Sequence, residues 1–290
     1  MNVTNGNTLS HDEAAVVELL RPYLSIRDVQ PLAGGLTNRC LKLTDEHGKH
    51  YVWRPQSRAS DLFNIDRNRE YECLTIASKH KLTSKPLINH EQGLLVEWIE
   101  GSQPTQLDVE RLLKLLHRLH QLPLPRQQFH PAKQGRDYFS NLSPESERFS
   151  RLKCVHDQCQ QINCMGTGQR VFCHFDFGLY NLIETPENGL QIIDFEYAAA
   201  GDPLLDIVFF CRANELDVMR VMNDYCELNN QREHEKWAGL VPNYELLSDY
   251  LSLLWFELGY QLYGLPIYED NAKMILTELE GRLCMGKAAY

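Results

Sequence analysis

Residues 171–181 read Val-Phe-Cys-His-Phe-Asp-Phe-Gly-Leu-Tyr-Asn, and residues 191–196 read Gln-Ile-Ile-Asp-Phe-Glu. The first stretch contains His-x-Asp-x-x-x-x-Asn, and the second is an apolar strand pattern that ends in acidic residues. A turn-forming segment lies between them, so a hairpin would bring Asn181 and Asp194 together. Phosphoryl transfer needs a carboxylate at the attacking hydroxyl and oxygen ligands for Mg²⁺. Asp176 is the candidate for the first role, and Asn181 and Asp194 are candidates for the second.

The two stretches resemble the catalytic loop and the metal-binding strand of the superfamily of aminoglycoside phosphotransferases and choline kinases, which are relatives of the protein kinases. A lone His-x-Asp would indicate only a satisfied polar core, but Ile-Ile-Asp-Phe-Glu-Tyr follows at the expected distance. The resemblance implies ATP and Mg²⁺ as cofactors, with Asp176 as the catalytic residue and Asn181 and Asp194 as metal ligands. It also implies that His174 and Asp206 support the catalytic loop rather than contact substrate.

A nucleotide clamp is expected upstream of these motifs. Residues 32–38 read Leu-Ala-Gly-Gly-Leu-Thr-Asn and lie between two predicted strands. Glycines let a backbone approach phosphates closely, although the segment alone would indicate only a turn. In this position it resembles the Gly-Gly-x-Thr/Ser-Asn loop of choline kinases and their bacterial relatives. The resemblance implies ATP contacts from Gly34, Gly35, Thr37 and Asn38.

Further nucleotide contacts are expected from the strand, helix and hinge that follow. Arg54 ends the next strand, where the resemblance to choline and thiamine kinases implies an arginine that binds phosphate oxygens. Glu70 in the following helix is the predicted partner of Arg54, with Glu72 as a weaker alternative and a solvated charged face as the other interpretation. The segment from Glu97 to Ile99 resembles the hinge whose backbone groups contact adenine.

Hydrophobic periodicity divides the chain into a strand-rich start and a helix-rich remainder. Period-two alternation predicts hairpins over residues 39–54 and 86–98, and helical spacing predicts a helix over 65–79. Beyond Gly101 the signals become helical, except that the polar stretch 126–143 is expected to be irregular.

This organisation, together with the resemblance, predicts an α+β, two-lobed protein-kinase-like fold. A small N-terminal β-sheet lobe that clamps ATP would occupy residues 1–97, and a hinge would occupy 98–102. A larger, mainly helical C-terminal lobe, with the catalytic and acceptor-binding residues, would occupy 103–290.

The acceptor of the phosphoryl group is harder to infer. Glu196 follows the metal-binding Asp194, in an Ile-Asp-x-Glu-Tyr-Ala pattern that is similar to choline, ethanolamine and thiamine kinases. In the aromatic helix predicted over 250–263, Trp255 and Tyr260 could offer π faces to a quaternary ammonium or thiazolium group. The alternative, favoured for each ring taken singly, is that these aromatics pack in the core.

Composition limits the other possibilities. The formal net charge of −10 argues against nucleic-acid binding and mildly favours a cationic acceptor. With 43% hydrophobic and 23% charged residues the chain is expected to fold, and no apolar run reaches the length of a membrane span. We therefore expect a cytoplasmic enzyme without membrane insertion. The sequence does not fix its oligomeric state.

The predicted activity is transfer of the γ-phosphoryl group of ATP to the hydroxyl of a cationic alcohol, choline- or ethanolamine-like or thiamine. Two alternatives remain: an aminoglycoside or sugar phosphotransferase, and a catalytically inactive nucleotide-binding regulator. Intact Asp176, Asn181 and Asp194 argue against the regulator. Relatives commonly carry a His or Pro between the catalytic Asp and the Asn, whereas residues 177–180 read Phe-Gly-Leu-Tyr, which weakens any inference of the substrate from this loop.

Overall fold

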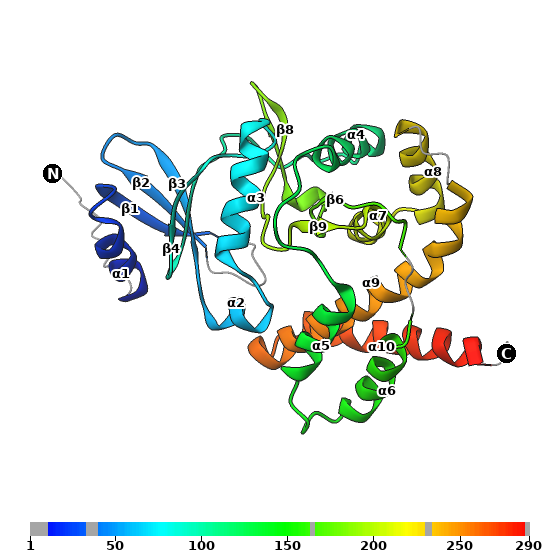
Figure 1. Ribbon diagram of the computed structural model, residues 1–290. Coiled ribbons are helices and arrows are strands. Elements are labelled where there is room, and N and C mark those ends of the chain that lie inside the picture. Colours follow the sequence, from blue (N-terminus) through cyan, green and yellow to red (C-terminus); the bar gives the residue numbers. More distant parts are fainter. Residues whose placement is uncertain (1–10, 33–39, 163–165, 230–233, 288–290) are drawn as a thin grey trace.

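Five short strands form an antiparallel sheet near the N-terminal end of the chain (Figure 1). The computed structural model describes residues 11–32, 40–162, 166–229 and 234–287. The strand order is β1-β2-β3-β5-β4, and each neighbouring pair of strands is antiparallel. The strands are β1 (Ile26–Pro31), β2 (Leu41–Asp45), β3 (His50–Pro55), β4 (Pro86–His90) and β5 (Gly93–Glu97).

Both predicted hairpins are present, and each has a local cause. Asp45 closes the β2–β3 turn, because its Oδ1 accepts hydrogen bonds from the backbone N–H groups of His47 and Lys49, both at 2.9 Å. In the β4–β5 hairpin, a Cβ on Gly93 would lie 2.5 Å from Cζ2 of Trp53, so only glycine lets the turn pass over the buried indole. Local turn chemistry therefore sets the register of the sheet.

Helices cover both faces of this sheet. Figure 1 shows α1 (His11–Leu20) on one side and α3 (Arg67–Lys79) on the other. The short α2 (Arg58–Leu62) precedes α3. The predicted helix over 65–79 is confirmed, but it begins two residues later because the Asp66 carboxylate caps it by accepting from the N–H of Asn68 at 2.8 Å.

The rest of the chain is mainly helical and contains two clusters of buried apolar side chains. The prediction that residues 126–143 are irregular is wrong, since the helix α5 (Pro131–Ser140) lies there. Pro131 occupies the first turn of that helix, where its fixed φ favours helix formation. Gly135 faces the Tyr250 ring, where a Cβ would lie 2.5 Å from Cε1. The helices are α4 (Val109–His120), α5 (Pro131–Ser140), α6 (Phe149–Cys159), α7 (Pro203–Ala213), α8 (Val218–Leu228), α9 (His234–Tyr263) and α10 (Pro266–Lys287).

Two small ribbons carry the sequence motifs. Strand β6 (Val171–Cys173) pairs with β9 (Ala199–Gly201), and β7 (Leu182–Thr185) pairs with β8 (Gly189–Ile192). A 3₁₀ turn, η1 (Leu179–Asn181), leads into β7. The hairpin expected between the two motifs is therefore confirmed, and in Figure 1 both ribbons lie in the region bordered by α3, α4 and α7.

The segment that follows β5 runs directly to this hairpin. Ser102 and Glu184 exchange two backbone hydrogen bonds, at 2.8 and 3.2 Å. A Cβ on Gly101 would lie 2.3 Å from the carbonyl oxygen of Glu184, so a glycine is needed at this crossing. The boundary itself, a hinge at 98–102, stays a prediction. Within the described ranges, each helix is too short or too polar to cross a lipid bilayer.

Candidate active site

The catalytic loop is held by a buried carboxylate from α7. Asp206 accepts hydrogen bonds from the backbone N–H of His174 at 2.9 Å and of Phe175 at 2.6 Å. These bonds stabilise the left-handed φ of +62° at Phe175, which a side chain rarely adopts. His174 contacts the second motif, because its Nε2 lies 3.1 Å from the carbonyl oxygen of Ile193. Burial lowers the pKa of His174, which favours a neutral ring that donates there.

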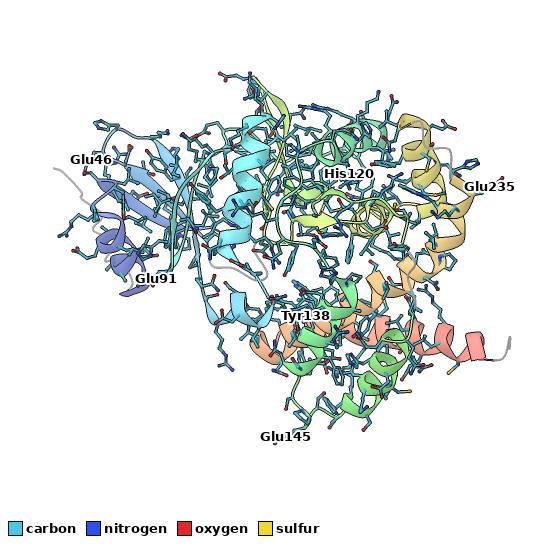
Figure 2. The ribbon with its side chains drawn as sticks, in the orientation of Figure 1. Glu46, Glu91, His120, Tyr138, Glu145 and Glu235 are labelled. Atoms are coloured by element: carbon cyan, nitrogen blue, oxygen red, sulfur yellow. The ribbon has the colours of Figure 1, made fainter. Side chains whose placement is uncertain are left out.

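His120 and Tyr225 form a buried pair that supports Asp206, and the sequence analysis did not identify this pair. His120 Nε2 lies 2.9 Å from Asp206 Oδ2, and His120 Nδ1 lies 2.7 Å from the Tyr225 hydroxyl (Figure 2 labels His120 on α4). Cys173 adds a thiol, so this cluster has donor types that bind metals. Burial raises the pKa of Cys173, and the other ligand atoms already make hydrogen bonds. The cluster is therefore better explained as support for the loop.

Both carboxylate oxygens of Asp176 receive hydrogen bonds from the same short loop. The Tyr180 hydroxyl donates to Oδ1 at 2.5 Å, and Asn181 Nδ2 donates to Oδ2 at 2.8 Å. The pKa of Asp176 is raised to about 7, mainly because the carboxyl is buried; the charge of Asp194 contributes to this increase, and the two hydrogen bonds oppose it. A fixed carboxylate at the head of a loop can orient a hydroxyl and accept its proton.

The two candidate metal ligands are adjacent across the hairpin. The N–H of Ile193 donates to the carbonyl oxygen of Asn181 at 2.9 Å, which places Asn181 beside Asp194. Asp194 has a φ of +64° and directs its carboxylate toward Arg54, whose Nη2 it binds. One amide oxygen and one carboxylate form the hard oxygen set that Mg²⁺ prefers, so these side chains fit the predicted ion.

A buried charge cluster lies next to this pair. Arg54 Nε lies 2.6 Å from Glu70 Oε1, an ion pair whose angle falls outside hydrogen-bond geometry, and Arg54 Nη2 donates to Glu196 Oε2 at 3.0 Å. Arg67, which the sequence analysis missed, also contacts Glu70 and lies 3.4 Å from Glu196. Burial, followed by the charge of Asp194, raises the pKa of Glu196. Two guanidinium groups and three carboxylates thus form one network.

Glu70, the predicted partner of Arg54, forms an ion pair with it, whereas Glu72, the weaker alternative, lies elsewhere. Glu72 accepts from the backbone N–H of Arg126 at 3.2 Å and does not contact Arg54. Arg67 stands three residues before Glu70 on the same helix face, and this spacing in the sequence could have predicted the ion pair between them.

The expected adenine segment uses its N–H groups within the protein. The N–H of Glu97 donates to the carbonyl oxygen of Lys85 at 3.0 Å, and that of Trp98 donates to His50 at 3.2 Å. Contacts from Glu97 and Ile99 to adenine therefore stay a prediction. The other predicted ATP contacts lie outside the described residues, namely Gly34, Gly35, Thr37 and Asn38.

A cavity of about 520 Å³ opens beside Asp176 and extends to α9 and α10. Its size suits a small organic molecule. Trp255 lies on its wall and donates from Nε1 to the Tyr197 hydroxyl at 2.9 Å. In Figure 2 Tyr138, another lining residue, lies on α5. The aromatic lining residues are Phe129, Tyr138, Phe175, Tyr180, Tyr197, Phe209, Trp255 and Phe256.

The wall formed by α7 and the residues just after it, by α9 and by α10, here called the far wall, carries more negative than positive side chains. Arg212 is a lining residue, but it is paired with Asp249 at 2.9 Å and with Glu245 at 3.3 Å. Glu215 and Glu278 also line the cavity, and among the described residues they make no ion pair with a basic side chain. The acidic residues leave this wall with a net negative charge.

Two residues predicted to contact the acceptor are not brought to this cavity. Tyr260 instead has its ring 5.5 Å from the guanidinium carbon of Arg148, and Glu196 lies in the charge cluster with Arg54. Of the three predicted residues, the structure places only Trp255 on the wall. Phe175, Asp176 and Tyr180 line it from the first motif, whereas most of the other lining residues come from distant segments for which the sequence offered no local signal.

Comparisons with known proteins identify the family and the fold of this chain. A family model described as "Phosphotransferase enzyme family" matches residues 28–240. The protein LicA of Haemophilus influenzae is 24% identical over 247 residues, which are 77% of this chain and 70% of that protein. The crystal structure of choline kinase LicA from Streptococcus pneumoniae superposes with a TM-score of 0.73 and 21% identity, covering 94% of this chain and 100% of that one.

A structure of LicA in complex with AMP has the same TM-score and identity, and covers 94% and 99% of the two chains. An ethanolamine kinase from Plasmodium vivax has a TM-score of 0.70 at 17% identity, covering 95% of this chain and 91% of that one. These likenesses confirm the α+β, protein-kinase-like fold with its N-terminal antiparallel sheet and mainly helical remainder. They also confirm the superfamily that the motifs resemble.

Proposed function

Because the chain belongs to the phosphotransferase enzyme family, we propose that it transfers the γ-phosphoryl group of Mg-ATP to the hydroxyl of a cationic alcohol, choline- or ethanolamine-like or thiamine. One observation carries this proposal: Asp176 lines a cavity whose other lining residues are largely aromatic and include more acids than bases. Relatives that are named as choline kinase and ethanolamine kinase support it, as does a relative that was solved with AMP.

In the proposed mechanism Asp176 orients the acceptor hydroxyl. The acceptor oxygen attacks the γ-phosphorus, the bond from that phosphorus to ADP breaks, and the hydroxyl proton passes to Asp176. Asn181 and Asp194 would hold Mg²⁺, which neutralises charge on the phosphate oxygens. Their oxygen donors fit that ion, and their loop is fixed before substrate binds.

Arg54 would bind phosphate oxygens, and its buried neighbours prepare it for this role. Glu70 lies against Nε of Arg54, which orients the guanidinium toward the catalytic loop. Phosphate oxygens would replace Asp194 as partners of Nη2 and release that carboxylate for the metal ion. Gly34, Gly35, Thr37 and Asn38 would cover the phosphates, and the hinge at 98–102, with Glu97 and Ile99, would contact adenine.

The wall chemistry favours a cationic acceptor over a neutral one. Aromatic faces attract a quaternary ammonium or thiazolium group by about 0.5–2 kcal/mol per contact. Trp255 is only half-buried, so one part of its ring is available, and Glu215 and Glu278 add negative charge nearby. A neutral sugar would gain little from these groups.

A polycationic aminoglycoside is the second candidate. The cavity volume of about 520 Å³ exceeds the size of choline, and acids on the far wall could contact several ammonium groups. An inactive nucleotide-binding regulator is less consistent with the geometry. Such a protein would have no need of an Asp176 that is fixed at the cavity mouth by two hydrogen bonds.

An acceptor screen tests the proposal. ADP release by the purified protein would be measured with Mg-ATP and choline, ethanolamine, thiamine, aminoglycosides or sugars, beside the Asp176→Asn protein. We expect release that depends on a cationic alcohol and disappears in the variant. Release with aminoglycosides alone would select the second candidate, and stimulation by sugars alone would overturn the proposed acceptor class.

A further inference from the structure

Tyr180 belongs to both the catalytic loop and the acceptor cavity. Its hydroxyl donates to Asp176 Oδ1 at 2.5 Å, while its ring lines the same cavity as Trp255. The residue is 50% exposed, which is high for an aromatic side chain. Asn181 already occupies Oδ2 of Asp176, so the half-exposed Tyr180 binds Oδ1, the oxygen that an acceptor hydroxyl would need.

The backbone under Tyr180 is fixed, but its ring is not enclosed. Asn214 accepts from the N–H of Leu179 and donates to the carbonyl oxygen of Phe177, both at 3.0 Å. Gln103 Nε2 donates to the carbonyl oxygen of Tyr180 at 2.8 Å. The ring lies over Gly178, where a Cβ would be 2.2 Å from Tyr180 Cε1. Glycine at 178 thus permits this ring position.

The two hydrogen bonds to Asp176 differ in their freedom to change. Asn181 donates from a buried side chain that also binds the backbone oxygen of Asp176 at 2.9 Å. Tyr180 donates from a side chain that opens to the cavity, so rotation about its side-chain bonds can withdraw the hydroxyl into solvent. Only the Tyr180 bond can be exchanged without disturbing the loop.

We propose that Tyr180 is a positioning residue whose hydroxyl holds the place of the acceptor hydroxyl on Asp176 until an acceptor displaces it. This inference rests on the proposed function. An arriving alcohol would donate to Oδ1 in place of the phenol, and the displaced ring would lie against the body of the acceptor in the cavity.

A consequence follows for the reaction with water. Water at Oδ1 would attack the γ-phosphorus, break the bond to ADP, and yield ADP, inorganic phosphate and a proton. While Tyr180 occupies Oδ1, water is kept from that place. The phenol therefore limits the loss of ATP when no acceptor is bound.

The test is Tyr180→Phe, which removes the hydroxyl and keeps the ring. Mg-ATP hydrolysis without acceptor should rise about threefold to tenfold, as the loss of one ordinary hydrogen bond that competes with water would give. The KM for an acceptor should fall, since the alcohol no longer competes with the phenol. Gly178→Ala, which displaces the ring while leaving its hydroxyl, should change hydrolysis in the same direction.

Tyr23→Phe is the matched control, because Tyr23 is 62% exposed and lies just after α1. Unchanged or slower hydrolysis in Tyr180→Phe would overturn the proposal and make Tyr180 a permanent partner of Asp176. If the wild type phosphorylates none of the alcohols, the proposed function fails. The hydrolysis rates of the wild type and Tyr180→Phe still decide the role of Tyr180 in that case.

Discussion

The catalytic loop and the acceptor cavity are built in opposite ways. The groups around Asp176 come from residues 171–206 together with Arg54 and Glu70, and nearly all of them are fixed by buried hydrogen bonds or ion pairs. The cavity wall is assembled from α5, α7, α9 and α10, and it is largely aromatic. The difference indicates that, in the proposed reaction, the chemical step depends on buried polar contacts around one short segment, whereas acceptor choice depends on how the helices pack.

The largest expected effect concerns the catalytic loop. Asp176→Asn conserves volume, so the fold and ATP binding should survive, while kcat falls by about 10²–10⁴ because the amide cannot accept the proton. Steady-state kinetics, with a thermal melt as the control for folding, measure this. Normal turnover by the variant would mean that another group orients the hydroxyl.

The second-largest effect is expected at Asp194, one of the two proposed Mg²⁺ ligands. Asp194→Ala removes one oxygen ligand, so affinity for Mg-ATP should fall at least about tenfold. Adenosine binding without metal should be retained, because adenine lies in the predicted hinge. Calorimetry with and without Mg²⁺ measures the affinity for Mg-ATP and for adenosine separately. Equal Mg-ATP affinity in the wild type and in Asp194→Ala would mean that Asp194 does not hold the cation.

A smaller effect is expected on the cavity wall. Trp255→Leu should raise KM for a cationic alcohol severalfold, since one π contact is worth about 0.5–2 kcal/mol, while KM for ATP stays the same. Tyr260→Leu is the matched control, because that ring contacts Arg148 and does not line the cavity. Equal acceptor KM values for Trp255→Leu and the wild type would assign the indole to packing alone.

The smallest effect should come from the exposed acids. Glu278→Gln removes one charge from the far wall, and exposed charges contribute about 0.2–1 kcal/mol. Acceptor KM should rise up to about fivefold at low salt and less at high salt. Glu91→Gln serves as the control, because Glu91, labelled in Figure 2, lies in the β4–β5 turn and is not among the residues that line the cavity. A salt-independent change would contradict an electrostatic role.

The same contrast explains what the sequence could predict. The hairpin that joins Asn181 to Asp194 depends on turn residues within one short segment, and the pairing of Arg54 with Glu70 depends on one helix face. The hairpin could be predicted because neighbouring residues determine it, and the ion pair because helical spacing and the family resemblance indicated the two residues. The polar stretch 126–143 was expected to be irregular, although Pro131 stands at the first turn of a helix, where proline favours helix formation.

The positions of Glu196 and Tyr260 could not be predicted in this way. Glu196 stands two residues after the proposed metal ligand Asp194, but the fold places it beside Arg54 and Arg67. Tyr260 shares a helix with Trp255, yet only one of the two rings faces the cavity. Which face of α9 borders the cavity depends on how α5 and α10 pack against it, and local periodicity does not contain that information.

The most direct test is the product formed by the wild-type protein. Mg-ATP would be supplied with an equimolar mixture of a quaternary-ammonium alcohol and its neutral carbon isostere, and mass spectrometry would detect the phosphomonoester of each. We predict that the cationic product exceeds the neutral one by about tenfold or more, as two or more π contacts would give. Equal amounts of the two products would contradict a cation-selective cavity, and ADP with inorganic phosphate alone would contradict transfer to these alcohols.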